Sequence, residues 1–338
     1  MLLFRLKWGV ITLIMMVFLA GCSNNAKVNE SDHKRPDQKK ETYYAGKPLT
    51  ILTGGTSGVY FQLGNAMAKI YGEEVGALAS AQTTGASAEN TAKVSRGKAE
   101  IGFAMADTVA DAYNGQGNFA KYGALKNIRA IASLYPNYMQ IVTTKSSGIK
   151  TLEDLKGKDL AVGALGSGTE IMAKRILKGA GLTYDDVNAD FLSFSEGIEG
   201  IKNGTTDVAF LSSGYPNSGI MELAAVDDVV IIPVPEELTL KMKKKFPAIE
   251  KGSIPANTYK GAGKEVPTVK VSNVLVTNED LPDEAVYELT KTLFDNLDDL
   301  QNAHSAAGQI DVKKSAENLP LPLHPGAKKY YEEKGILQ

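Results

Sequence analysis

The chain has 338 residues, 43% of them hydrophobic and 22% charged, and its formal net charge at pH 7 is −2. This length and apolar content suffice for two lobes of ordinary size. The slight negative charge gives no electrostatic reason to expect nucleic acid as a partner.

Residues 1–21 are typical of a cleaved targeting segment. Arg5 and Lys7 form a basic start, and an apolar run follows that ends in Leu-Ala-Gly-Cys, with the only cysteine, Cys22, as its last residue. This order predicts a signal peptide, and a cysteine directly after the cleavage site predicts lipidation, for example with palmitate. A plain cleaved signal peptide and a short anchor helix are the alternatives, but the run is shorter than the ~20 residues that span a bilayer. We therefore expect an extracytoplasmic protein that is lipid-anchored to a bacterial membrane through Cys22.

Residues 22–47 are polar and lack periodicity, which predicts a flexible spacer. Strand and helix patterns then alternate. The strands are expected in PLTILTGG (48–55), ALASAQTT (77–84) and AEIGFAM (99–105), and the helices in the segment after Gly58 and in SAENTAKVSRG (87–97). Alternation of this kind predicts a parallel, doubly wound sheet.

The same order starts again near residue 151. RGKAEIGFAM (96–105) and NGTTDVAFLS (203–212) superpose without a gap, so that Gly97 matches Gly204 and Phe103 matches Phe210. The sequence thus predicts two similar lobes, residues 48–140 plus 272–338 and residues 141–271. Two crossings, MQIVTTKSSG (139–148) and VPTVKVSNVLVTNED (266–280), would form a hinge. A long C-terminal helix over residues 282–304 is expected to pack on the first lobe.

Each predicted lobe contains a glycine-rich loop between a strand and a helix, Gly54–Gly58 and Gly166–Thr169. Two ordinary corners that use glycine for close packing are one interpretation. Matching positions in two similar lobes favour a ligand between them, because a helix N-terminus offers unpaired N–H groups and a positive dipole end. Thr56, Ser57, Ser167 and Thr169 would add hydroxyl donors. We expect a small carboxylate-bearing ligand there.

Enzyme chemistry is not indicated. His33 lies in the spacer and His304 and His324 lie in the C-terminal tail, and no HExxH, CxxC, GxSxG or Walker A motif occurs. We therefore expect no catalysis, no metal site and no cofactor. Arg175 is expected on a solvated helix face, so backbone amides would bind the anion. A ligand amine would need a carboxylate, which Asp107, Glu170 or Glu89 could supply.

Six motifs stand in order from about Leu49 onward: LTGGTSGVYFQLGNAMA, SAENTAKVSRGKAEIGFAMADTVADAYNGQG, IRAIASLYPNYMQIV, GIKTLEDLKGKDLAVGALGSGTE, LTKTLFDNLDDL and LPLHPGAKKYYEEKG. With these motifs the chain resembles the TAXI-type solute receptors of tripartite ATP-independent periplasmic (TRAP) transporters. This resemblance implies the two-lobed periplasmic-binding fold of type II. It also implies TRAP permease subunits driven by an ion gradient as partners, and a small organic acid or an amino acid such as glutamate or glutamine as the ligand.

The resemblance also implies roles for single residues. Thr56, Ser57, Gly58 and Tyr60 would face the ligand from the first lobe, and Ser167, Gly168, Thr169 and Glu170 from the second. Asp107, Tyr135 and Ser213 would complete the site. Ala104 and Met105 stand where the family often has glutamine. The alternative function is that of a tethered sensory protein that feeds a signalling partner.

Overall fold

The computed structural model describes residues 42–337. The predicted signal peptide, Cys22 and most of the spacer lie outside this range. Within it, no helix has the length and apolar character needed to cross a membrane.

One mixed sheet runs through the described residues, with the strand order β2-β1-β3-β10-β4-β7-β5-β6. In addition, β8 pairs with β4, and β9 pairs with β10. The strands are β1 (Pro48–Leu52), β2 (Leu78–Gln82), β3 (Ile101–Met105), β4 (Ile128–Thr144), β5 (Asp159–Ala161), β6 (Asn188–Asp190), β7 (Val208–Ser213), β8 (Val229–Ile232), β9 (Ile249–Ile254) and β10 (Val266–Asn278).

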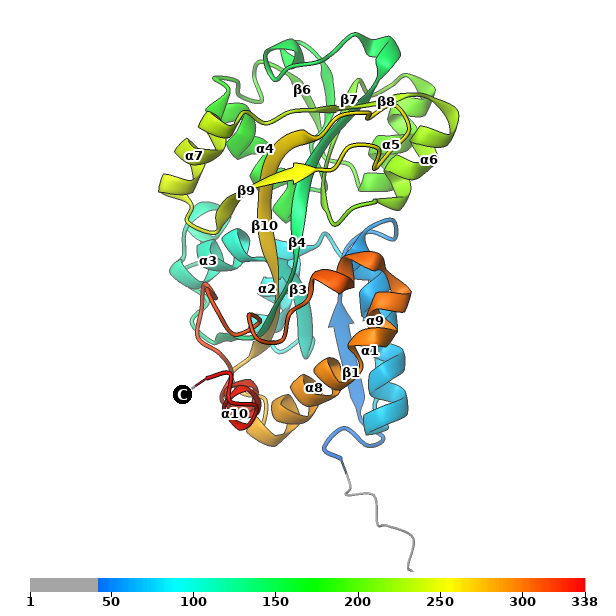
Figure 1. The fold of residues 1–338 in the computed structure, drawn as a ribbon. Coiled ribbons are helices and arrows are strands. Elements are labelled where there is room, and N and C mark those ends of the chain that lie inside the picture. The colour runs from blue at the N-terminus through cyan, green and yellow to red at the C-terminus, as the bar shows by residue number, and fades with distance from the viewer. Residues whose placement is uncertain (1–41, 338) are drawn as a thin grey trace, which may run out of the picture. The chain divides into compact units, whose positions relative to one another are not determined.

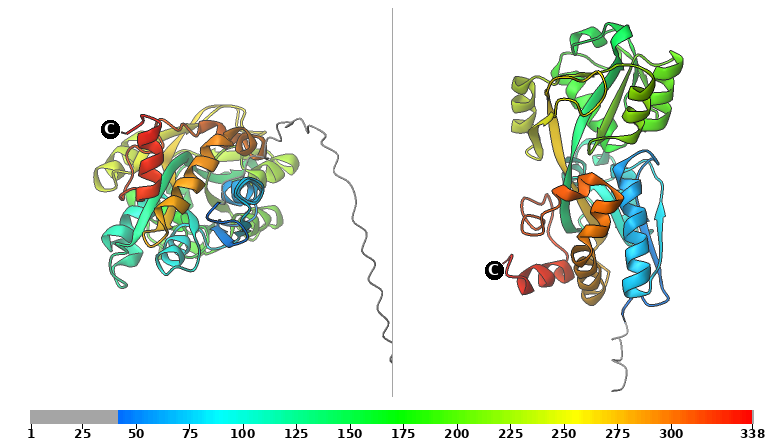
Figure 2. Two further views of the ribbon diagram at one scale, coloured as in Figure 1. Left: turned by 90° about the horizontal axis from the view of Figure 1, so that it is seen from below. Right: turned by 45° about the vertical axis from the view of Figure 1, so that its right-hand side comes forward.

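The helices cover this sheet in two groups (Figures 1 and 2). The first group is α1 (Val59–Val75), α2 (Ser87–Ser95), α3 (Ala106–Asn114), α8 (Asp283–Asp295), α9 (Leu297–Ala303) and α10 (Pro325–Glu333). The second group is α4 (Gly168–Gly179), α5 (Phe194–Asn203), α6 (Ser218–Val226) and α7 (Glu236–Lys245). The first group surrounds β1 to β3, and the second surrounds β5 to β8, so that the chain forms two lobes.

The strands β4 and β10 pass through both lobes (Figure 1). They pair antiparallel from Lys270 opposite Tyr138 to Asn278 opposite Ile128. No residue of β4 is exposed, because helices cover both faces of the sheet. These strands are the two crossings that the sequence predicts. The predicted lobe limits, after residues 140 and 271, fall within them and stay predictions.

Two predictions about secondary structure are wrong in part. The sheet is parallel only toward its ends, where β1 pairs with β2 and β3, and β5 pairs with β6 and β7. Around β4 and β10 the pairing is antiparallel. The long C-terminal helix is broken into α8 and α9 at Asn296, whose backbone has φ −122° and ψ 33°. Its apolar face still packs on α1, since Val286, Leu289 and Leu293 belong to the same core cluster as Leu63.

Helix α1 offers a matched pair of glycines that tests how closely it packs on the sheet. A Cβ on Gly64 would overlap Thr53 Cγ2, and Thr53 is fully buried with its hydroxyl bonded to the Gln82 carbonyl. We therefore expect Gly64→Ala to lower the free energy of unfolding by about 1–3 kcal/mol through overpacking. Denaturant titration measures this change.

Gly72 is the control, because a Cβ there would lie 3.6 Å from the Ala77 carbonyl oxygen, an ordinary contact. Gly72→Ala should raise the free energy of unfolding by about 0.5–1 kcal/mol, as helix propensity predicts. Equal effects of the two substitutions would show that α1 does not pack on Thr53 as described.

Candidate functional site

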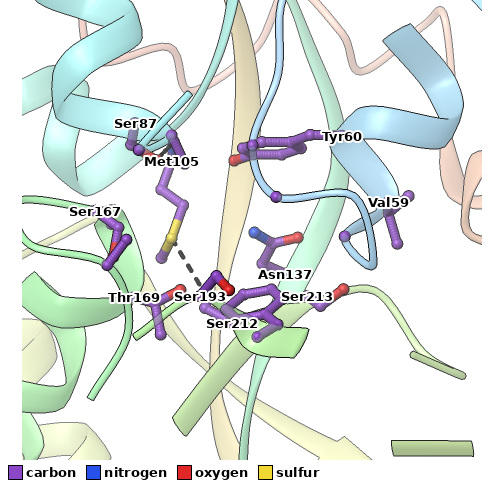
Figure 3. Close-up of a pocket in the computed structure, with 18 of the residues that line it drawn as sticks. Val59, Tyr60, Ser87, Met105, Asn137, Ser167, Thr169, Ser193, Ser212 and Ser213 are labelled. Carbon is purple, nitrogen blue, oxygen red and sulfur yellow. Dashed lines mark hydrogen bonds between the residues drawn. The ribbon is translucent and has the colours of Figure 1, made fainter. Parts of the chain in front are cut away.

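A cavity of about 80 Å³ lies between the lobes (Figure 3). It is lined by Gly54, Gly55, Gly58, Val59, Tyr60, Thr84, Gly85, Ala86, Ser87, Met105, Tyr135, Asn137, Ala164, Ser167, Gly168, Thr169, Ser193, Phe194, Ser212 and Ser213. None of these residues carries a charged side chain. The lining is made of glycines, hydroxyl groups, one amide and apolar side chains.

Four helices begin at this cavity. The residue before each helix and the first residue of the helix both line it: Gly58 and Val59 for α1, Ala86 and Ser87 for α2, Ser167 and Gly168 for α4, and Ser193 and Phe194 for α5. The first N–H groups of a helix lack partners within the helix, and they form the positive end of its dipole. An anion is therefore the ligand that this arrangement favours.

The two lobes differ in how their helices are capped. The Ser167 hydroxyl accepts a hydrogen bond from the Glu170 N–H at 3.0 Å, and Ser193 forms a capping box with Glu196. Neither α1 nor α2 has a side-chain cap. Ala86 has φ +67° and ψ −139°, a region that residues other than glycine rarely adopt. The first lobe thus presents the helix ends with fewer of their N–H groups already bound.

Two tyrosines and an asparagine supply side chains from α1 and β4. Tyr60 donates its hydroxyl to Asn273 Oδ1, and Asn273 Nδ2 donates to Asn137 Oδ1 at 2.9 Å. Because Asn137 uses its Oδ1 as the acceptor in these hydrogen bonds, its Nδ2 can donate to a ligand. Tyr135 is fully buried, and its hydroxyl has no hydrogen-bond partner. Burial raises the pKa of Tyr135 well above its usual value, so its hydroxyl stays protonated and can donate.

Hydrogen bonds next to the cavity join the lobes. The Ser57 carbonyl accepts from Asn217 Nδ2 at 3.2 Å and from the Ser218 hydroxyl at 3.1 Å. The Ser195 hydroxyl donates to the Ser57 hydroxyl at 3.0 Å. The structure is therefore that of a closed arrangement, in which a loop of the first lobe touches α5 and α6 of the second.

Seven of the eleven predicted ligand-binding residues line this cavity: Gly58, Tyr60, Tyr135, Ser167, Gly168, Thr169 and Ser213. The other four do not. Thr56 is exposed, and Ser57 joins the lobes. Glu170 accepts a hydrogen bond from the Tyr184 hydroxyl at 2.9 Å, and Asp107 pairs with Arg175. As no ligand is present, all the binding roles stay predictions.

Arg175 does not lie on a solvated face, and that prediction is wrong. Its side chain in α4 is 10% exposed, pairs with Asp107 and Asp111 of α3, and lies with its guanidinium carbon 3.9 Å from the centre of the Phe246 ring. Burial raises the pKa of Asp107 although Arg175 lowers it, so desolvation is the larger effect. Arg175 thus joins the lobes on a second side and occupies the carboxylates of Asp107 and Asp111.

Sequence reasoning missed eleven lining residues that lie outside the two glycine-rich loops or beyond their predicted ends: Val59, Thr84, Gly85, Ala86, Ser87, Met105, Asn137, Ala164, Ser193, Phe194 and Ser212. A signal existed for two groups of them. The segment from Thr84 to Ser87 follows a strand and opens a helix, and Ser193 stands three residues before Glu196, the spacing of a capping box. Asn137 could not be found in this way, because it lies within a continuous strand.

The model of the NMT1-like family matches residues 51–335. Among solved structures, a protein from Bordetella bronchiseptica RB50 is 18% identical with a TM-score of 0.50, over 86% of this chain and 82% of that one. PhnD1 from Prochlorococcus marinus, in complex with methylphosphonate, is 13% identical with a TM-score of 0.53, over 86% and 99%. A binding-protein component of an ABC phosphonate transporter from Pseudomonas aeruginosa is 13% identical with a TM-score of 0.50, over 78% and 80%.

These comparisons confirm the predicted fold, a two-lobed periplasmic-binding fold of type II. The predicted role, a solute-binding protein that serves a transporter, stays a prediction, because neighbours that are 13% and 18% identical show the fold alone. The assignment to TAXI-type receptors of TRAP transporters is wrong. The family that matches is the NMT1-like family, and the Pseudomonas neighbour is named as part of an ABC transporter. Two of these motifs contain the glycine-rich loops, and the others lie mainly on helices and strands such as β4 and α10.

The Arg175 cluster generates a stability prediction. We expect Arg175→Met to lower the free energy of unfolding by about 3–5 kcal/mol, because it leaves the buried Asp107 without its counter-ion. The control is Lys291→Met, which removes an exposed helical pair with Asp295 and should change stability by less than about 0.5 kcal/mol. Urea titration compares the two variants, and a loss for Arg175→Met no larger than the control's would contradict the structural role.

Proposed function

The chain belongs to the NMT1-like family, and from this premise we propose that it is an extracytoplasmic receptor for a small carboxylate. The two lobes enclose the solute, and the closed protein then delivers it to a membrane transporter. One observation carries this proposal: four helix N-termini from two lobes meet at a small, uncharged cavity.

The cavity suits a small anion by size and by its donors. Its volume of about 80 Å³ is well below the roughly 300–1,000 Å³ of pockets that hold drug-sized ligands. The donors on offer are backbone N–H groups and the side chains of Ser87, Tyr135, Asn137 and Thr169. The structure of PhnD1 with methylphosphonate gives an example of a small oxyanion bound by a protein of this fold.

The ligand would also couple binding to closure. In the open state an anion could meet the helix ends of only one lobe, whereas in the closed state it meets α1 and α2 together with α4 and α5. A ligand shifts an equilibrium by its difference in affinity for the two states. The solute would thus favour the closed arrangement, which the transporter could then distinguish from the empty receptor.

Calorimetry on the purified protein with acetate, succinate and glutarate tests the proposal. We expect at least one of them to bind, and a hundredfold excess over its Kd to stabilise the fold by about 2.7 kcal/mol. Tyr135→Phe should weaken that binding about tenfold, because it removes a buried donor that no protein group uses, and it should not lower the stability of the empty protein, since the lost hydroxyl has no hydrogen-bond partner there.

The control for this variant is Tyr60→Phe, which leaves Asn273 Oδ1 without its donor. It should lower the stability of the empty protein by about 1–3 kcal/mol. If none of the oxyanions binds while a sugar or a cation does, the proposed function is wrong.

Membrane attachment is a separate part of the proposal. The basic start, the apolar run and the Leu-Ala-Gly-Cys ending support lipidation of Cys22. We expect Cys22→Ser to remain uncleaved or to be released from the membrane, and to lose label in cells fed a radioactive fatty acid. Lys27→Ser, a change in the predicted spacer, should keep the label. Equal labelling of the Cys22→Ser variant would rule out this anchor.

A further inference from the structure

The charge pattern around the cavity narrows the solute class. We infer that the solute carries an oxyanion but no ammonium group, so that the receptor selects simple acids against the corresponding amino acids. This inference rests on the proposed function. It comes from two independent features, a buried hydroxyl donor without a partner at Tyr135 and a lining with no carboxylate.

The three carboxylates that could have met a ligand amine have partners within the protein. Asp107 pairs with Arg175 through Oδ2, while its buried Oδ1 has no hydrogen-bond partner, and Glu170 accepts the hydroxyl of Tyr184. Glu89 pairs with Lys93 at 2.6 Å and accepts the Gly85 N–H. None of the three lines the cavity. An enclosed ammonium would therefore find no anionic partner.

The helix ends make the cavity unfavourable for a positive charge. Each of the four N-termini directs partial positive charge toward it, which stabilises an anion and repels a cation. A buried ammonium without a carboxylate loses its hydration and gains little in return. The Ser57 carbonyl, an acceptor close to the cavity, is already bound by Asn217 and Ser218.

The floor of the cavity is neutral as well. Ser212 on β7 lies with its hydroxyl 3.4 Å from Met105 Sδ on β3, so that a hydroxyl and a thioether meet where the two lobes approach (Figure 3). A single carboxylate placed here would give an ammonium the partner that it lacks. A substitution at Ser212 can therefore change the preference of the cavity for simple acids over amino acids.

Calorimetry with matched pairs tests the inference on the unmodified protein. The pairs are glutarate and glutamate, succinate and aspartate, and methylphosphonate and aminomethylphosphonate. We expect the member without an amino group to bind at least 100-fold more tightly in each pair that binds. The affinities for the two carboxylate pairs are compared with those for the phosphonate pair. This comparison shows whether the oxyanion of the solute is a carboxylate or a phosphonate.

Two failures can be told apart. If glutamate or aspartate binds as tightly as its amine-free partner, the inference is overturned and the proposed function stands. If no member of any pair binds, the proposed function fails, and the inference fails with it.

A matched pair of variants tests the physical cause. Ser212→Asp should weaken binding of the simple acid and shift the ratio of affinities toward the amino acid by at least tenfold. Ser212→Asn, of nearly the same size but neutral, should leave the ratio unchanged. Equal ratios in the two variants, with both shown to be folded by thermal unfolding, would contradict the inference. If Ser212→Asp does not fold, the affinities of the unmodified protein for the ligand pairs test the inference.

Discussion

The antiparallel pairing of β4 with β10 is the constraint on which the site depends. Its register, together with that of the neighbouring strands, places Met105 at the end of β3 opposite Asn273 and Ser213 at the end of β7 opposite Tyr138. Both strand ends therefore reach the same stretch of β4, where Tyr135 and Asn137 line the cavity beside a register shift between Ser272 and Val274. A slip of one residue would turn these side chains away from the cavity. No residue of β4 is exposed, which makes such a slip costly.

In the receptor that we propose, the two lobes would hold an anion without a basic side chain, because the cavity lining carries none. A buried arginine or lysine would be costly to desolvate in the empty receptor. Helix dipoles and N–H groups are fixed by the fold and need no rearrangement when a ligand arrives. The backbone of Ala86, strained by about 1–3 kcal/mol in such a region, turns the start of α2 toward the cavity. We interpret this strain as the cost of orienting one set of donors.

The sequence contained enough information for the fold and for half of the site. Periodic apolar residues identified α1, and the repeat of Phe103 at Phe210 correctly related β3 to β7, which flank the two long strands. Both glycine-rich loops line the cavity, because local backbone chemistry at a strand-to-helix turn is readable from sequence. Each of these features depends on residues close together in the chain.

What could not be predicted depends on contacts between distant segments. From its position in the sequence, Arg175 is expected on a solvated helix face. In the structure, Asp107 and Asp111 of α3 contact it, and this contact joins segments more than sixty residues apart. The same pairing removes Asp107 from the site that its position at a strand end suggested. The same carboxylates could form an inter-lobe ion pair or line a ligand cavity. The packing of the lobes determines which of the two they do. Here the packing pairs Asp107 and Asp111 with Arg175 and leaves the cavity lining without a charged side chain, which in the receptor that we propose would disfavour a solute with an ammonium group.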